Sequence, residues 1–270
     1  MKLPSLHAIG VALALACAAS PLAAQLDYRN LDDHRPVRTE DAYTIERYAF
    51  EFMLPAEYGA DVSGERTLVL APEAAYGVVM NGQVGIKLPV ALMQPEGAAD
   101  EWGLAGPRLF ALYNLNSEGP SLPGFALRTD LALPLGGLAG SGARVTLKAV
   151  ATRGWGLTRL HVNAGASFGS GGVDAAVDAE PDWMVTAALD RTLLRHSLLV
   201  IGELAVLRLP ESAATEVTAS IGARYQLTPT LVLDGGLGRR LTADAGPDFE
   251  FTVGLTHAFG IAGLMPRGGS

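Results

Sequence analysis

The sequence predicts an all-β fold: a transmembrane, antiparallel, up-and-down β-barrel of about twelve strands. Large aliphatic residues alternate with small or polar ones through most of the chain, which is the pattern of strands with two different faces. The chain is 49% hydrophobic but still 18% charged, with 32 glycines, so its apolar residues are plentiful and interrupted. After the first segment, no apolar run reaches the roughly 18–20 residues of a spanning helix.

The first segment has the features of a secretory signal peptide over residues 1–24. Lys2 is followed by an apolar run from Ile9 to Ala16, and small residues lead to Ala24. Cleavage after Ala24 would remove Cys17 and leave a mature chain without cysteine. The alternative is a lipoprotein acylated at Cys17, although the leucine before it is one position off the usual pattern.

Three further segments are expected after cleavage. Residues 25–44 are polar, carry Pro36 and show no period, so we expect an N-terminal extension that folds into the lumen or lies at its periplasmic mouth. Residues 45–259 are expected to form the barrel, and residues 260–270 a C-terminal tail.

The predicted strands follow one another with few interruptions. Most have about ten residues, the length that a tilted strand needs to cross a bilayer. In chain order they are Arg47–Leu54, Thr67–Tyr76, Gln83–Leu92, Arg108–Leu115, Phe125–Leu135, Arg144–Ala151, Arg159–Phe168, Trp183–Asp190, Leu198–Val206, Val217–Gln226, Leu231–Leu237 and Phe249–Phe259.

The strand Gln83–Leu92 illustrates the choice between a membrane barrel and a soluble β-fold. Ile86 and its alternate neighbours would face lipid in a barrel and the core in a soluble fold, while Lys87 would take the other side. Asn81-Gly82 predicts a tight hairpin before this strand. Connections along the chain are mostly longer and shorter in turn, the loop pattern of outer-membrane barrels. We therefore favour the barrel, with Pro89 marking a bulge or weak point in its wall.

Charged residues of both signs fall on the face that lacks large aliphatics, with Gly and Ala between them. This composition suits a narrow lumen. The candidate lumen-lining residues are Arg47, Glu51, Glu73, Lys87, Arg108, Arg128, Asp130, Arg144, Lys148, Arg159, His161, Asp190, Glu203, Arg224, Asp234 and Glu250.

The sequence offers little support for other chemistry. There is no basic stripe for nucleic acid, no phosphate-binding loop and no metal-ligand spacing, so we expect no nucleic-acid partner, cofactor or metal. A hydrolase would need a Ser and a His that converge at the outer rim. His161 and Asn163 face the lumen by parity, and no serine can be assigned to them, so we expect no enzyme activity.

Several stretches resemble a family of bacterial outer-membrane β-barrel transporters, the meta-pathway phenol-degradation type, which is porin-like. The resemblance covers most of the mature chain and consists of strand patterns. Its stretches are RPVRTEDAYTIERYAFEF from Arg35, APEAAYGV from Ala71, GIKLPVAL from Gly85, YNLNSE from Tyr113, TDLALPLG from Thr129, TRGWGLTRLHVNAGASFG from Thr152, GARYQLTPTLVLDGGLGR from Gly222 and FTVGLTHAF from Phe251.

The resemblance implies a channel or transporter for small solutes in the bacterial outer membrane, among them hydrophobic or aromatic compounds. The partners would be outer-membrane lipid, the solute and the barrel insertion machinery, which would recognise the C-terminal strand ending at Phe259. Two alternatives stay open: a structural or surface-interaction barrel with a plugged lumen, supported by the Gly-rich loop Gly169–Glu180, and, less favoured, an outer-membrane hydrolase.

Overall fold

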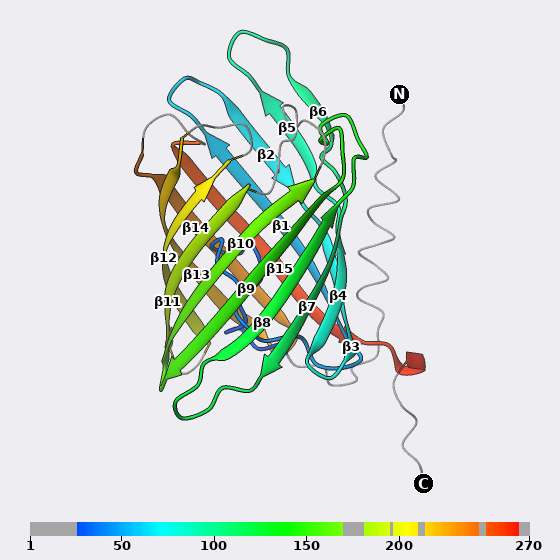
Figure 1. Ribbon diagram of the computed structural model, residues 1–270, viewed down its shortest axis with the longest axis vertical. Coiled ribbons are helices and arrows are strands. Elements are labelled where there is room, and N and C mark those ends of the chain that lie inside the picture. Colours follow the sequence, from blue (N-terminus) through cyan, green and yellow to red (C-terminus); the bar gives the residue numbers. More distant parts are fainter. Residues whose placement is uncertain (1–25, 170–180, 195–196, 210–213, 243–246, 265–270) are drawn as a thin grey trace.

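The computed structural model describes residues 26–169, 181–194, 197–209, 214–242 and 247–264. They form one closed antiparallel barrel of twelve strands, shown in Figure 1. Fifteen strand segments are distinguished, because three of the twelve strands are interrupted near their middle. No helix in these ranges is long and apolar enough to span a membrane. The predicted signal peptide, with Cys17, and residues 265–270 of the predicted tail lie outside the described residues.

The twelve strands that these segments form run in chain order around the barrel, and the last pairs with the first. Their bounds are β1 Ala49–Ala60, β2 Arg66–Leu70, β3 Glu73–Val79, β4 Gly82–Lys87, β5 Val90–Gln94, β6 Glu101–Leu104, β7 Arg108–Asn116, β8 Gly124–Ala132, β9 Arg144–Trp155, β10 Thr158–Gly169, β11 Trp183–Leu193, β12 Leu198–Arg208, β13 Glu216–Thr228, β14 Leu231–Arg240 and β15 Phe249–Gly260.

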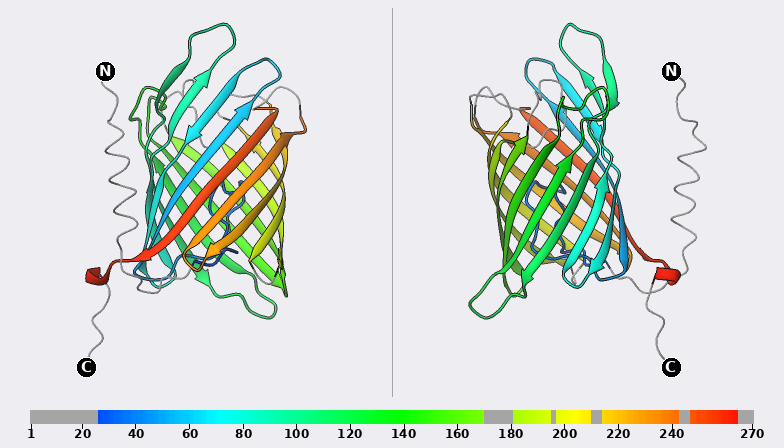
Figure 2. Two further views of the ribbon diagram at one scale, coloured as in Figure 1. Left: turned by 180° about the vertical axis from the view of Figure 1, so that it is seen from behind. Right: turned by 45° about the vertical axis from the view of Figure 1, so that its right-hand side comes forward.

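Closure is made by β15 and β1, which pair along their whole length from Ala49 opposite Gly260 to Ala60 opposite Phe249. The chain therefore enters and leaves the barrel at one end, which we call the terminal end. The opposite end is the loop end. Figures 1 and 2 show the loop end at the top, with tall hairpins.

The faces of the wall follow the predicted alternation. Ile86 is 39% exposed on the outside, whereas Lys87 is 4% exposed inside. The same contrast recurs around the barrel, with exposed Leu, Val and Phe outside and buried charged residues inside. A continuous apolar outer wall is what a barrel in lipid requires, and closure leaves no unpaired strand edge at mid-height. The soluble alternative would bury the aliphatic face, so it is wrong.

Connections differ from the expected pattern at two places. The loop Ser117–Pro123 is longer than the turns that follow β3, β9 and β13 at the terminal end. Two bonds hold it: the side chain of Asn116 donates to the Pro123 carbonyl (2.8 Å), and Glu118 accepts from the Gly154 N–H (2.9 Å). Between the predicted strands Gln83–Leu92 and Arg108–Leu115 the structure has a further strand segment, β6, which begins at Glu101 and pairs with β5. Beyond Gly169, the predicted loop Gly169–Glu180 lies outside the described residues.

A row of X-Pro dipeptides runs across the wall from the middle of β1 to the loop end of β8. Pairing on both sides places Pro55 opposite Ala71 and Pro72 opposite Leu88. The register of β5 with β6 places Pro89 opposite Ala105, and that of β7 with β8 places Pro107 opposite Leu133. Each proline carbonyl accepts one hydrogen bond from its partner, at 3.2, 2.9, 2.9 and 2.9 Å. Proline has no N–H, so the return bond of each pair cannot form. We call these four half-bonded pairs the proline seam.

The wall between the seam and the loop end is also less regular. β6 pairs with β5, and no strand in the described ranges pairs with its other edge. The segment between β8 and β9 covers that edge instead, where the Leu138 N–H donates to the Leu104 carbonyl (3.2 Å). Gly136 makes this approach possible: its φ is 119°, and a Cβ there would lie 2.0 Å from the Leu104 oxygen.

Candidate functional site: an occupied lumen

The lumen contains the N-terminal segment of the chain itself. Residues 26–48, which we call the plug, precede β1, and residues 26–45 of the plug lie among the inward-facing side chains, as the dark-blue trace inside the barrel in Figure 2 shows. The plug has no regular secondary structure, so its backbone groups need partners from the wall. They find them around most of the circumference. Residues 25–44 were expected in the lumen or at its mouth; the structure places residues 26–44 in the lumen.

Glu40 fixes the middle of the plug to β8, β9 and β10. Its backbone N–H and carbonyl both bond the side-chain amide of Asn163, each at 2.8 Å. Its carboxylate accepts from Arg128 at 2.8 Å and lies 3.5 Å from the ammonium of Lys148. Asp33 pairs with the same Lys148. Burial of these charges is tolerable only because each has a partner of opposite sign.

A second set of bonds connects Asp41 and Ala42 to β9, β10 and β11. Arg159 lies 3.3 Å from Asp41 and 2.6 Å from Asp190. The Ala42 N–H donates to the hydroxyl of Thr152 at 3.0 Å. That hydroxyl is 2.9 Å from Nδ1 of His161, whose Nε2 is 3.0 Å from Asp190. These groups form one continuous hydrogen-bond network under the plug.

Thr152, His161 and Asp190 are hydrogen-bonded in the same order as the members of a catalytic triad. The Thr152 hydroxyl, however, already accepts a hydrogen bond from the Ala42 N–H of the plug. All three side chains are at most 1% exposed. A nucleophile needs room for a substrate carbonyl and donors for the developing oxyanion, and the plug backbone takes that place. The network holds the plug and offers no site for hydrolysis in this arrangement.

Arg35 and Pro36 dock on β13, β14 and β15. Arg35 donates to the Thr256 hydroxyl at 2.7 Å and lies 3.4 Å from Asp234. The Pro36 carbonyl accepts from Thr252 at 3.0 Å. A Cβ on Gly236 would lie 2.1 Å from that carbonyl oxygen, so only glycine allows the plug to approach this closely.

Fifteen of the sixteen candidate lumen residues lie on inward positions of the strands; Arg144 and Glu250 among them are partly exposed near the loop end. Arg47 is the exception and its assignment is wrong. It is exposed because β1 begins only at Ala49, and its guanidinium lies 4.5 Å from the ring centroid of Tyr48. The candidates do not line an open pore. Many of them instead bind the plug, among them Arg128, Lys148, Arg159, Glu203 and Arg224.

Sequence reasoning missed the plug side of these contacts and several neutral wall residues. Asp32 and Asp33 carry two of the charges that the wall binds. Asn114 donates to the Ala42 carbonyl at 2.6 Å, and Gln83 accepts from the Ile45 N–H at 2.8 Å. A usable signal existed in the high charge density of residues 27–41, because such a segment next to a mixed-charge lumen has complementary partners inside it.

Two apolar clusters lie in the lumen toward the loop end. One cluster lies directly behind the seam and consists of Val69, Ala71, Ala91, Ala105 and Leu138, with Met93 packed against it. A second lies across the barrel on β11 and β12 and consists of Met184, Ala205 and Leu207, with Leu209 packed against it. Neither cluster includes a plug residue. These side chains would suit apolar contents.

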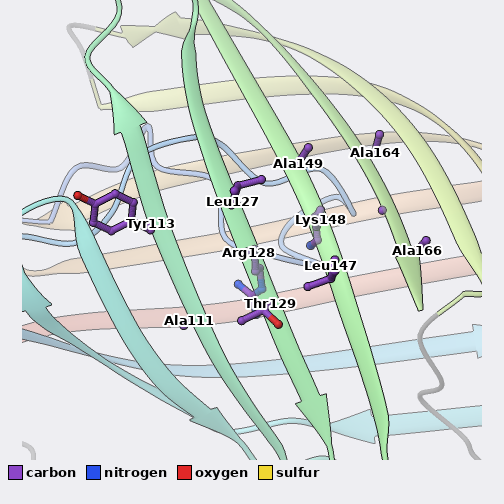
Figure 3. A pocket seen from close by; sticks show the side chains of 11 residues that line it. Ala111, Tyr113, Leu127, Arg128, Thr129, Leu147, Lys148, Ala149, Ala164 and Ala166 are labelled. Atoms are coloured by element: carbon purple, nitrogen blue, oxygen red, sulfur yellow. The ribbon is translucent and has the colours of Figure 1, made fainter. Parts of the chain in front are cut away.

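The outer wall carries a shallow hollow of about 670 Å³ over β7 to β10. Figure 3 shows small side chains such as Ala149 and Ala164 on its floor, with Leu127 and Tyr113 beside it. Arg128 and Lys148 lie behind the sheet and reach the lumen side. Lack of side-chain volume explains the hollow, which faces the same surroundings as the rest of the apolar wall.

Comparison with known proteins identifies the fold. The structure is similar to the COG4313 outer membrane channel from Pseudomonas putida F1, with a TM-score of 0.61 and 14% identity over 85% of this chain and 100% of that one. It is also similar to the KdgM porin in complex with disordered oligogalacturonate, with a TM-score of 0.50 and 13% identity over 78% of this chain and 99% of that one. The β domain of the Bordetella autotransporter BrkA is similar too, with a TM-score of 0.50 and 12% identity over 78% of this chain and 99% of that one.

No protein-family model matches the chain, and no curated protein matches it in sequence. At identities of 12–14% the likeness concerns the fold alone. The expected resemblance to an outer-membrane transport barrel is thus confirmed at the level of the fold. Because channels and an autotransporter domain share that fold, function must be argued from the lumen and the wall.

Proposed function

We propose that this chain is an outer-membrane channel of a Gram-negative bacterium for small hydrophobic solutes, and that these solutes pass through the barrel wall at the proline seam. The seam is the observation that carries the proposal. It concentrates four half-bonded pairs in neighbouring strands, whereas a lipid-embedded wall normally satisfies every backbone group. The C-terminal strand ending at Phe259 would serve recognition by the insertion machinery.

Both sides of the seam suit an apolar solute. Outside it, Leu70, Leu88 and Val90 are 46%, 40% and 39% exposed. Inside it, Ala71, Ala91 and Ala105 present small apolar side chains, covered by Leu138. The inward-facing charged residues nearest the seam in these strands, Glu73, Lys87 and Arg108, lie on its terminal side. The aqueous alternative, a pore along the axis, would have to displace the plug and break its ion pairs.

The covering segment allows a reversible test. A Cβ on Gly103 would lie 3.6 Å from Cγ of Leu138, so side chains at these two positions are in van der Waals contact and a pair of cysteines there can approach each other. The variant G103C/L138C has no other cysteine after removal of residues 1–24. Cells that express it should take up N-phenyl-1-naphthylamine, a hydrophobic dye that an intact outer membrane excludes, only after reduction. The control A187C/L204C joins outward-facing partners of β11 and β12 and should not respond to reduction.

A plugged barrel that acts through its outer surface is the second candidate. The many bonds between plug and wall favour it. It predicts that the wild-type protein promotes neither dye uptake nor ion conductance, and that the disulfide changes nothing. Dye uptake that depends on reduction would exclude it.

A further inference from the structure

We propose that the loop end of the lumen contains a binding site for an organic cation with an apolar body, and that Arg38 of the plug occupies this site as an internal substitute. The inference rests on the proposed channel function and assigns a preferred solute class to it. It starts from the surroundings of Arg38, which hold four carboxylates.

Arg38 is surrounded by carboxylates from four strands. Its guanidinium pairs with Glu250 of β15, and its backbone N–H donates to Glu203 of β12 at 3.2 Å. Glu216 of β13 and Glu57 of β1 complete the group. Burial alone would lower the pKa of Arg38, but attraction to Glu250, Glu216 and Glu203 outweighs burial and raises the pKa.

Among the residues that the structure describes, one other cation faces this group, and it is already engaged. Arg240 of β14 lies near Glu216, but its guanidinium is 2.7 Å from Asp248 and 3.8 Å from Asp61 at the rim. Carboxylates therefore outnumber cations in this group, both with and without Arg240 and its partners Asp248 and Asp61. A site with this balance attracts positive charge and repels anions.

The acidic group is incompletely satisfied. Glu216 is 1% exposed, and one of its oxygens accepts from the Thr218 hydroxyl at 2.7 Å. Its other oxygen has no hydrogen-bond partner among the described residues, and neither has Nε of Arg38. A buried carboxylate oxygen without a donor is costly. An ammonium group can donate three hydrogen bonds in any direction and would satisfy it.

An apolar surface lies directly beside the carboxylates. Glu216 is the cross-strand partner of Leu207, and Thr218 is the partner of Ala205. Leu207 and Ala205 pack with Met184 in the cluster described above. A carboxylate group directly beside an apolar surface fits an amine with an aromatic or aliphatic body. Exchange of Arg38 for such a ligand conserves charge, because one cation replaces another.

The test uses the purified, folded full-length barrel and three probes of equal size: benzylammonium, benzyl alcohol and benzoate. Isothermal titration should show benzylammonium bound at least tenfold more tightly than benzyl alcohol, with no binding of benzoate. E216Q should weaken benzylammonium binding at least tenfold. E118Q, which removes a carboxylate at the terminal end of the lumen, should not change it. R38Q removes the internal competitor and should strengthen binding at least fivefold, whereas R38K should behave as wild type.

Equal binding of amine and alcohol, equal weakening by E216Q and E118Q, or weaker binding in R38Q would overturn the inference. Heat-modifiable gel mobility identifies variants that fail to fold, and if R38Q is one of them, the comparison of the three probes on the wild-type barrel still tests the site. Dye uptake by the same variants separates the two proposals. Uptake without amine preference removes the cation site alone; amine binding without uptake removes the channel function and leaves the site as a property of a plugged barrel.

Discussion

Repair of the proline seam is the most direct test of the route through the wall. The double variant P72V/P89V supplies the two missing N–H groups in neighbouring pairs, at positions whose partners, Leu88 and Ala105, already donate in the other direction. Valine suits a strand, and a proline-like φ lies within the β region. The substitution therefore completes the ladder without a change of register.

The expected magnitude follows from two bonds. Each restored backbone bond contributes about 1 kcal/mol net, so opening at both pairs becomes about 2 kcal/mol harder. Since 1.4 kcal/mol corresponds to a factor of ten, the open population should fall roughly thirtyfold, and dye uptake with it. Global stability should change much less, because replacing a proline also frees the unfolded chain at a cost of about 0.4–1 kcal/mol per site.

This difference between uptake and stability makes the experiment specific. Initial rates of N-phenyl-1-naphthylamine uptake are compared at equal amounts of folded protein, and urea unfolding is measured in vesicles. P247V, in the connection between β14 and β15, is the matched control. A double variant that folds and still takes up dye within twofold of the wild-type rate would refute the role of the seam.

Three further predictions test the faces and the plug. I86R should lower the unfolding free energy by about 2–4 kcal/mol, as for arginine on a lipid-facing wall near the bilayer midplane; K87Q, on the lumen face, should cost less than half as much in the same urea titration. G236A should displace the plug and raise ion conductance in planar bilayers, whereas G202A, where an added Cβ has nothing within 4 Å, should not. Burial would raise the pKa of Asp33, but attraction to Lys148 and Arg128 outweighs burial and holds the pKa well below 3.8. Because the pKa is lowered, the Asp33 carboxylate stabilises the docked plug above pH 3.8 and loses this effect as the pH falls through the lowered pKa. Conductance should therefore rise at the acid extreme, and D33N should already show the higher conductance at neutral pH.

The barrel could be predicted because its rule is local. The side chains of a strand alternate between faces, and a lipid-facing wall accepts few charges, so Ile86 and Lys87 could be assigned from sequence alone. The strand at Arg47 was extended too far because the alternation continues into the turn before Ala49. Alternation alone does not mark the residue at which pairing with β15 begins.

The plug could not be predicted in the same way, because an irregular segment follows no period. Its path depends on contacts such as Glu40 with Asn163, which lie far apart in sequence. The seam is an intermediate case. Pro55, Pro72, Pro89 and Pro107 recur at nearly equal intervals, and only an up-and-down topology with known register converts such intervals into one row. Pro89 alone could be interpreted as a weak point but not as part of a seam.

The plug and the seam should behave as independent barriers, because they oppose different solutes. Ion pairs between plug and wall, such as Arg128 with Glu40 (2.8 Å), close the aqueous path along the barrel axis. The wall beside Leu138 instead blocks the passage of apolar solutes. G236A should therefore raise conductance without raising dye uptake. The oxidised G103C/L138C variant should block uptake and leave conductance unchanged. A variant of either kind that altered both properties together would show that solutes of both classes share one route through the axis, and the route through the wall would then be wrong.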